Sequence, residues 1–438
     1  MVGADREMSA PECAAERQTQ SPDPKRNDKT PAPGVTTTGE SRTMRNSLRE
    51  AAKLFLAAAC GLTFAFTVYF FLFATVSENA VGSRDCAVYW ATGQQIARHG
   101  NPYDRDALVR IERAAGLPGS KRIVYTGNPP WTLPLVYPLG LVGLRSASIA
   151  WSMLLLACFA GSVRMLWVMD GRPRNYRYLL GYSFGPALIC LIMGQTTILA
   201  LLGLVLFLRL HRTSPFLAGV SFWLGMLKPH LFLPFGVVLL AWAIVSRSYK
   251  ILIGAATAIA ASCAVAFLII PMEWSQYVQM LRQPGNGFEF VACLSALLRL
   301  WIDKDAAWLQ YLPSALGCIW GLGYFWPRRF RWDWMKDGSV LMLVSLIVAP
   351  YTLLYDQVLA IPALLQGAYV TRSRSKLATL ALLSALVEAG LIGLMWSPSS
   401  LYIWTLWSAP AWLVWYLWAT GNKETQAERI RGSAAIAD

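Results

Sequence analysis

The stretch LFLAAACGLTFAFTVYFFLFATV occupies residues 54–76, and SRDCAVYW follows it closely at residues 83–90. The first stretch is long enough to cross a bilayer as a helix, which takes about 20 apolar residues. Asp85 follows so soon afterwards that we expect it at the bilayer surface, where a charge serves a function or faces solvent. The two stretches together predict a membrane protein with a polar group at one membrane face.

The composition supports a polytopic helical membrane protein. Hydrophobic residues make up 55% of the 438 residues and charged residues only 15%, against about a quarter charged in soluble domains. The formal net charge is +14, which in a soluble protein would suggest nucleic acid. We expect no nucleic-acid partner here, because Lys and Arg concentrate in the cytoplasmic loops of membrane proteins.

Hydropathy predicts about twelve transmembrane helices in an all-α fold. Some of the apolar runs are shorter than the usual span. They lie near residues 54–76, 146–169, 178–193, 196–210, 214–227, 231–246, 250–271, 311–326, 338–350, 354–371, 376–396 and 401–419.

If the N-terminus is cytoplasmic and each run crosses the membrane in the opposite direction to the one before, basic segments fall on the cytoplasmic side. The inside segments are 170–178, 209–213, 246–250, 327–337, 372–376 and the tail from 422, as the positive-inside rule requires. This orientation holds only if residues 129–144, which Pro residues interrupt, do not cross the membrane. We therefore expect surface-lying helices in a large first outer loop, 77–145.

Both ends of the chain are predicted to be cytoplasmic tails. Residues 1–43 are polar and rich in Pro, Ser and Thr, which favours a disordered tail. The translation start is either Met1 or Met44. Residues 44–420 form the predicted transmembrane domain, and 421–438 form the second tail. Cys86 and Cys293 both fall outside, so a disulfide between them is one option.

Two outer segments carry groups suited to chemistry. Asp85 is either a general base that deprotonates a hydroxyl acceptor or an exposed loop acid. Lys228 and His230 form a predicted cationic pair in Lys-Pro-His. They either bind a lipid phosphate or, for Lys228, anchor a helix by snorkelling.

Further polar groups fall at the same predicted face. Gln195 either binds sugar hydroxyls or bridges helices. Asp356, next to Tyr355, either binds sugar or forms an ion pair with Lys228. Tyr89 belongs to an aromatic rim that fits sugar stacking as well as an ordinary interfacial belt.

Short motifs in this order resemble glycosyltransferase family 87, the polyprenol-phosphate-mannose-dependent α-mannosyltransferases of the GT-C superfamily. The resemblance runs from about residue 50 to residue 420. Its motifs are Asp85–Tyr89 with Ala91-x-Gly93, Gly100-Asn101-Pro102-Tyr103-Asp104, Tyr125-x-x-Asn128-Pro129-Pro130, Gly194-Gln195, Ala218-Gly219, Lys228-Pro229, and Pro350-Tyr351 through Tyr355-Asp356. One departure is the family's Tyr-Pro-Pro step, which three residues interrupt here.

The resemblance implies a GT-C-type fold and an inverting hexosyltransferase, with mannose as the expected sugar. Asp85 would be the base, and Lys228 and His230 would bind the donor phosphate. Tyr89, Asn128, Gln195, Tyr355 and Asp356 would bind sugar or acceptor. The partners would be a polyprenyl-phosphate-sugar donor, a lipid or glycan acceptor and membrane lipids, with no cofactor and no metal.

The active site would face the outer, periplasmic side of the inner (plasma) membrane. The main alternative is a transporter or flippase for a lipid or sugar. Transporters place polar groups at the bilayer midplane and often have inverted repeats, whereas the polar groups here collect at one face. A structural assembly partner is a third option.

Overall fold

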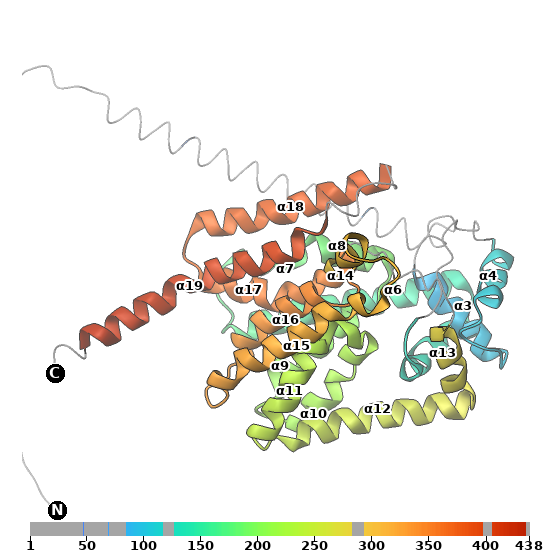
Figure 1. Cartoon of the computed structure of the whole chain (residues 1–438). Coiled ribbons are helices and arrows are strands. Elements are labelled where there is room, and N and C mark those ends of the chain that lie inside the picture. Colours follow the sequence, from blue (N-terminus) through green and yellow to red (C-terminus); the bar gives the residue numbers. More distant parts are fainter. Residues whose placement is uncertain are drawn as a thin grey trace, which may run out of the picture. The chain divides into compact units, whose positions relative to one another are not determined.

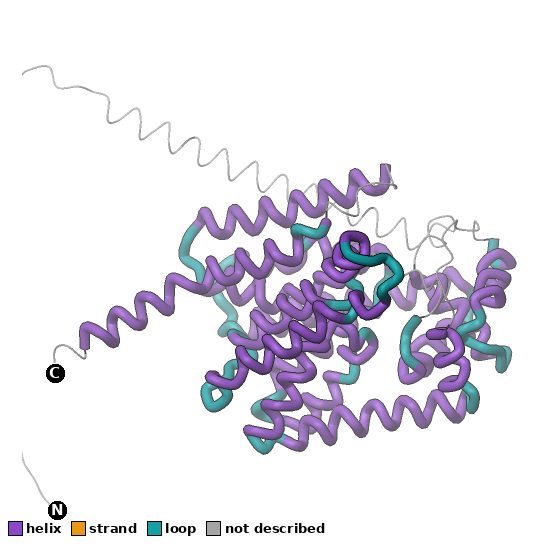
Figure 2. Tube along the Cα trace, in the orientation of Figure 1, coloured by secondary structure: helices purple, strands orange, loops and turns teal. Residues whose placement is uncertain are grey.

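The computed structural model describes residues 85–116, 127–282, 293–396 and 405–434, together with the single residues 47 and 69. Its contacts divide the chain into two units, residues 1–59 and 60–438, and the elements below belong to the second. The predicted span at 54–76 and the tail at 1–43 lie outside the described residues. The described residues are helical, with no strand among them (Figure 2).

The first described elements of the second unit are short helices. These are α3 (Asp85–Ala97), α4 (Arg105–Ala114), η1 (Pro130–Thr132), α5 (Leu133–Val136) and η2 (Tyr137–Leu141). Asp104 begins α4, because its Oδ1 accepts the backbone N–H groups of Asp106 at 3.0 Å and Ala107 at 3.1 Å. Residues 129–144 thus hold three short pieces and no single helix of spanning length.

Helix α3 packs closely on η2 at a contact between two glycines. A Cβ on Gly93 would lie 2.6 Å from the backbone nitrogen of Gly140. Trp90 Nε1 donates to the Val142 carbonyl at 2.9 Å, which fixes the same contact from the side. The helix that begins with Asp85 therefore lies on the Pro-rich segment.

The helices that follow form a bundle (Figure 1). Its first half contains α6 (Leu144–Met169), η3 (Tyr176–Tyr178), α7 (Leu179–Tyr182), α8 (Gly185–Met193), α9 (Thr197–Leu210), α10 (Pro215–Phe222), η4 (Gly225–Leu227), η5 (Pro229–Phe232), α11 (Leu233–Val245), α12 (Tyr249–Ile269) and α13 (Glu273–Arg282). Its second half contains α14 (Leu294–Trp301), η6 (Ala307–Gln310), α15 (Leu312–Phe325), η7 (Trp326–Arg328), α16 (Asp337–Val348), η8 (Leu354–Ala360), α17 (Ile361–Val370), α18 (Arg374–Trp396) and α19 (Ser408–Ala434).

The expectation of twelve spans is not confirmed. Among the described residues, Leu144–Met169 and Tyr249–Ile269 are long and apolar enough to cross a membrane, and the pair Tyr176–Tyr182 with Gly185–Met193, bent by 43°, could be a third. Pro and Gly break several apolar runs into shorter helices. Thr197–Leu210, for example, has 14 residues and spans about 21 Å at 1.5 Å per residue, less than the ~30 Å hydrocarbon core.

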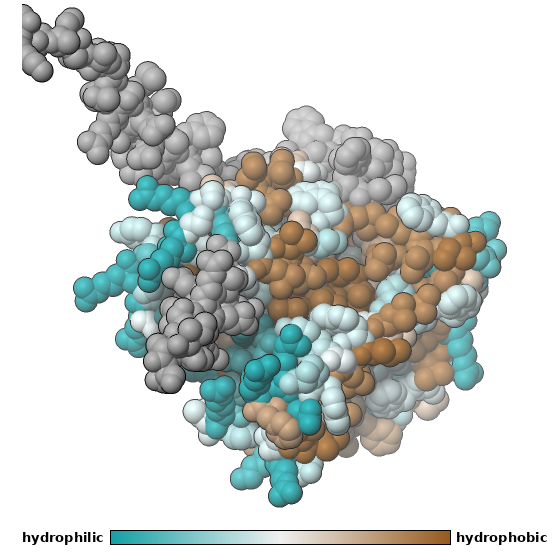
Figure 3. Space-filling model, turned by 60° about the vertical axis from the view of Figure 1, so that its left-hand side comes forward, coloured by the Kyte–Doolittle hydropathy of each residue, from teal (hydrophilic) through white to brown (hydrophobic). Residues whose placement is uncertain are grey.

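Apolar side chains reach the surface as well as the core. Leu268 on α12 is 79% exposed and Ile319 on α15 is 68% exposed. Figure 3 shows a broad apolar area on one face, with polar residues nearer its margins. Such a large exposed apolar surface suits contact with lipid, which agrees with a membrane protein.

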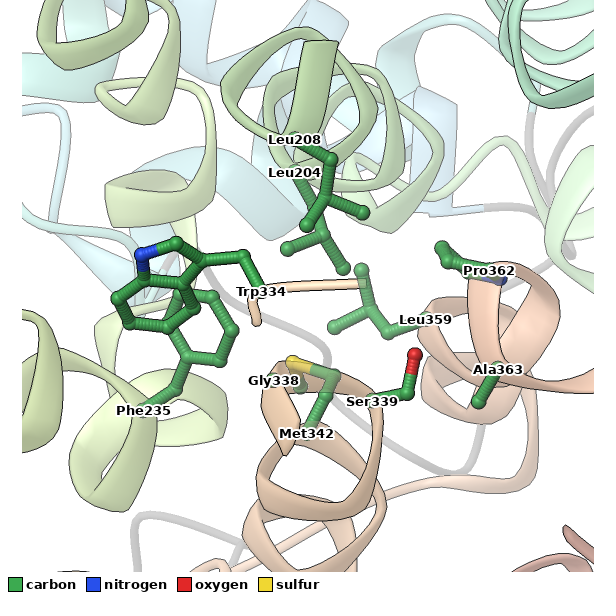
Figure 4. Close-up of a pocket in the computed structure, with 10 residues that line it drawn as sticks. All are labelled: Leu204, Leu208, Phe235, Trp334, Gly338, Ser339, Met342, Leu359, Pro362 and Ala363. Atoms are coloured by element: carbon green, nitrogen blue, oxygen red, sulfur yellow. The ribbon is translucent and has the colours of Figure 1, made fainter. Parts of the chain in front are cut away.

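The core between α9, α11, α16 and α17 is packed with aromatic and aliphatic side chains. Trp334 lies 4.9 Å from Phe235 between ring centroids. A small gap remains here, lined by Leu204, Leu208, Phe235, Trp334, Gly338, Ser339, Met342, Leu359, Pro362 and Ala363 (Figure 4). Its lining is almost entirely apolar and includes none of the predicted site residues.

Candidate functional site

Polar side chains from four distant segments meet in one buried network. Tyr89 OH donates to Gln195 Oε1 at 3.4 Å, and Lys228 Nζ donates to the same oxygen at 3.0 Å. Gln195 Nε2 donates to Tyr355 OH at 3.0 Å. Lys228 Nζ also lies 2.7 Å from Asp356 Oδ1. The structure thus brings together five of the residues that the sequence singled out.

Gln195 enters this network because the chain turns sharply between α8 and α9. Gly194 ends α8 in the left-handed region, at φ 72°, which glycine adopts without a Cβ clash. Trp151 Nε1 donates to the Gly194 carbonyl at 2.7 Å and fixes the turn from α6. Sequence reasoning missed Trp151, since it lies in the middle of an apolar run.

Asp356 is the most thoroughly bonded member of the network. Its Oδ1 accepts from Lys228 and, at 2.7 Å, from Thr197 Oγ1, while Oδ2 accepts from the Leu353 backbone N–H at 3.0 Å. The side chain is 1% exposed, and buried carboxylates need such partners. Of the two roles considered for Asp356, the ion pair with Lys228 is present. Thr197 was not predicted.

Lys228 lies between η4 and η5 with a non-helical backbone, at φ −133° and ψ 70°. The following Pro229 disfavours the helical region for this residue. The ammonium group lies 4.9 Å from the centroid of the Tyr355 ring, and Lys228 is buried. The charge of Asp356 balances its own charge, which makes the centre of the network close to neutral.

Asp85, the first residue of α3, acts on the network electrostatically. Burial first, and the charge of Asp85 second, raise the pKa of both Tyr89 and Tyr355. Both tyrosines are therefore protonated at neutral pH and available as hydrogen-bond donors. The carboxylate of Asp85 lies within electrostatic reach of two hydroxyls from different segments.

The predicted cationic pair of Lys228 and His230 is wrong for His230. In the turn ahead of α11, burial lowers the pKa of His230 to about 3, with the Asp356 charge opposing and the Lys228 charge adding to the effect. The ring is neutral at pH 7 and stacks on Tyr351 at 3.9 Å between centroids. Its Nε2 is buried and has no hydrogen-bond partner within the described part of the chain.

Asn128 does not join the network by any contact found among the described residues. Its carbonyl accepts from Tyr103 OH at 3.2 Å, and its Nδ2 is buried without a partner. The optional disulfide is also not formed, because the described residues Cys86 and Cys293 are not bonded to each other.

The turn that carries Tyr355 and Asp356 is held from α14. Arg299 Nη1 donates to Gln310 Oε1 at 2.7 Å, and Gln310 Nε2 donates to the Pro350 carbonyl at 3.3 Å. Ser295 Oγ donates to the Ala349 carbonyl at 3.2 Å. Sequence reasoning missed these residues, since nothing in their spacing links them to residue 350.

A comparison with known protein families gives one match. The model of a family described as Glycosyltransferase family 87 matches residues 125–350, just over half of the chain. No curated protein and no solved structure matches. The matched region contains Asn128, Gln195, Lys228 and His230 and ends at the start of the turn that carries Tyr355 and Asp356.

Proposed function

The chain belongs to glycosyltransferase family 87, and from this premise we propose that it transfers a hexose, with mannose as the sugar, from a polyprenyl-phosphate donor. The protein is a membrane glycosyltransferase, which favours an enzyme over the transporter and assembly alternatives. In the proposal the acceptor is a lipid or glycan at the outer face of the inner (plasma) membrane. The proposed catalytic domain is residues 44–420, between the tails 1–43 and 421–438.

The observation that carries the proposal is the position of Asp85 beside the buried network. An acid and a group of hydrogen-bond donors converge, and the bonded partners in this group lie 33 to 160 residues apart along the chain. In the proposed step the acceptor oxygen attacks the anomeric carbon while its proton passes to the Asp85 carboxylate. The bond from that carbon to the phosphate oxygen breaks, prenyl phosphate leaves with the electron pair, and the anomeric configuration inverts.

The donor phosphate is proposed to lie at Lys228 and His230. The ammonium group of Lys228 has three donors, of which Gln195 and Asp356 take two. The neutral ring of His230 offers its unpartnered Nε2. Because Asp356 balances the Lys228 charge, this site would recognise the phosphate mainly through directed hydrogen bonds. Tyr89, Gln195 and Tyr355 would then contact sugar hydroxyls.

Asp85→Asn tests the proposed base. We expect transfer from a radiolabelled polyprenyl-phosphate hexose to fall by roughly 10²–10⁴-fold, with the variant folded and inserted. Asp106→Asn is the matched control, because Asp106 is exposed on α4. Near-normal turnover by Asp85→Asn would refute the assignment. Mannose, glucose and galactose donors identify the sugar, and NMR of the product's anomeric centre tests inversion.

His230→Phe tests the phosphate site while keeping a ring to stack on Tyr351. A hydrogen bond to a charged group contributes about 1.5–3 kcal/mol, so the donor KM should rise roughly 10-fold or more. His211→Phe is the control, since His211 stacks on Phe207 in the core. An unchanged donor KM in His230→Phe would remove His230 from the donor site.

Reporter fusions test the proposed orientation. Fusions at Arg174 and Lys336 should report a cytoplasmic position, and a fusion at Lys121, which lies outside the described residues, should report an external one. An external result at Arg174 would overturn the orientation and move the proposed site to the other membrane face.

A further inference from the structure

A second group of polar atoms without partners lies on α13, apart from the Lys228 network. Glu273 is fully buried, and neither of its carboxylate oxygens has a hydrogen-bond partner among the residues that the structure describes. Gln276 Oε1, one turn later, is likewise buried and without a partner. Buried polar atoms of this kind are rare and need an explanation, such as a bound molecule.

Helical spacing places these groups on one face of α13. Residues at i, i+3 and i+4 share a face, so Glu273, Gln276 and Tyr277 lie together. Tyr277 packs against Tyr103 at 5.3 Å between ring centroids, and the Glu273 charge reaches Tyr103 as well. The polar face of α13 is therefore turned towards Tyr103.

Asn128 borders the same tyrosine from the other side. Tyr103 OH donates to the Asn128 carbonyl at 3.2 Å, and the Asn128 amide Nδ2 is the third buried group without a partner. The cluster thus offers unused acceptors on Glu273 and Gln276 and an unused donor on Asn128.

Two tryptophans complete the cluster. Trp131 and Trp274 lie 6.0 Å apart between ring centroids, and Trp274 is 43% exposed. Trp131 Nε1 donates to the Met226 carbonyl at 2.8 Å, two residues before Lys228. This contact places the cluster beside the turn that carries the proposed donor site.

We propose that the cluster of Tyr103, Asn128, Trp131, Glu273, Trp274, Gln276 and Tyr277 binds one hexose ring of the acceptor. This inference rests on the proposed function. Sugar hydroxyls donate to Glu273 and Gln276 and accept from the Asn128 amide, and an apolar face of the ring packs on Trp274, from whose exposed side the sugar enters. A phosphate offers mainly acceptors and would leave the Glu273 and Gln276 acceptors without donors, and a metal ion would leave the Asn128 donor unused.

The test measures binding of methyl α-D-mannopyranoside and methyl α-D-glucopyranoside to the full chain in lipid nanodiscs. Ligand-detected NMR should show binding to the wild type, at least tenfold weaker binding to Glu273→Gln, and severalfold weaker binding to Gln276→Ala. Gln279→Ala is the matched control, because Gln279 is exposed on the same helix. Its binding should equal that of the wild type.

A purely packing role for Glu273 predicts a different result. If the carboxyl group only fills space, Glu273→Gln should bind the methyl hexosides like the wild type. That outcome, or no binding to the wild type, overturns the proposal. If Glu273 serves a ligand, Glu273→Leu should melt at a higher temperature than the wild type while losing hexoside binding, because a buried acid without partners is removed.

Failure here is distinguishable from failure of the proposed function. Methyl hexoside binding requires no transfer, so a protein that binds hexosides through Glu273 but never transfers sugar would contradict only the function. Active transfer with an unchanged acceptor KM in Glu273→Gln would contradict only the acceptor site. Prenyl phosphate without sugar should bind Glu273→Gln as it binds the wild type; weaker binding would move Glu273 to the donor side and overturn the proposal.

Discussion

Replacing one member of the Lys228–Asp356 pair should destabilise the protein far more than replacing both. Lys228 is 8% exposed and Asp356 is 1% exposed, so whichever charge remains after its partner is removed is poorly hydrated. Removing one partner of a buried pair costs about 3–5 kcal/mol, whereas replacing both with apolar groups of similar volume is often neutral or stabilising. We expect about 3–5 kcal/mol for Lys228→Met, and clearly less for Lys228→Met combined with Asp356→Leu.

The geometry makes Asp356→Asn a severe change in spite of its small size. Asp356 Oδ1 accepts from both Lys228 and Thr197, and Oδ2 accepts from the Leu353 N–H. An asparagine keeps one oxygen, so its amide must face either the Leu353 N–H or the Lys228 and Thr197 donors. One of these contacts becomes donor against donor, and Lys228 loses its counter-charge as well.

The assay is equilibrium unfolding of purified protein in detergent, arranged as a double-mutant cycle. Each single variant, Lys228→Met and Asp356→Leu, should lose more free energy of unfolding than the double variant does, with a coupling energy of about 2 kcal/mol or more. Lys250→Met is the control, because Lys250 is exposed. Additive single effects would refute the reasoning. Because of the same stability loss, the folding of any Lys228 variant has to be verified before its donor affinity is measured.

Three other perturbations probe the fold around the site. Gly93→Ala should destabilise the protein by about 1–3 kcal/mol in thermal melts, since its Cβ would clash with Gly140, whereas Gly143→Ala, with open space around it, should not. Arg177→Ala should cost about 1.5–3 kcal/mol, because its Nη1 donates to the carbonyls of Ala368 at 2.6 Å and Thr371 at 2.8 Å; exposed Arg174→Ala should match the wild type. Burial raises the pKa of Glu112 from 4.5 to about 7, so between these values the unfolded chain loses a proton that the folded chain keeps, and stability falls as pH rises before levelling off above pH 7. The pKa shift alone would correspond to a stability loss of about 3 kcal/mol, and the partial exposure of Glu112 reduces this loss to about 1–2 kcal/mol. Hydrogen exchange of α4, measured at pH 5 and pH 8 and corrected for intrinsic rates, should show the loss of stability in the wild type. Glu112→Gln should not show it.

Three members of the buried network could be predicted because each is a polar group in or beside an apolar run. Gln195, Lys228 and Asp356 interrupt otherwise hydrophobic sequence, and polar groups at such positions are costly unless they serve a purpose. The ion pair with Lys228 was one of two roles predicted for Asp356, and the sequence could not decide between them, since 128 residues separate the two side chains. Thr197 escaped notice because a threonine at the start of an apolar helix is ordinary.

The helix lengths show a different limit of sequence reasoning. Hydropathy finds the run at 178–193, but Phe184, Gly185 and Pro186 divide it into α7 and α8 with a bend of 43°. Glu273 was overlooked for a related reason. An acid at the first turn of a helix is common, and only the three-dimensional packing reveals that its oxygens have no partner.

The separation of Lys228 and Asp356 along the chain has a consequence for biogenesis. At a translation rate of about 5–20 residues per second, Asp356 is synthesised on the order of ten seconds after Lys228. During that interval Lys228 lacks its counter-charge, so its long side chain must hold the ammonium group at the water interface. The ion pair of the network forms only after the turn at Tyr351–Asp356 has been synthesised. A nascent chain that stops before this turn would keep an unpaired charge, which quality-control proteases could recognise.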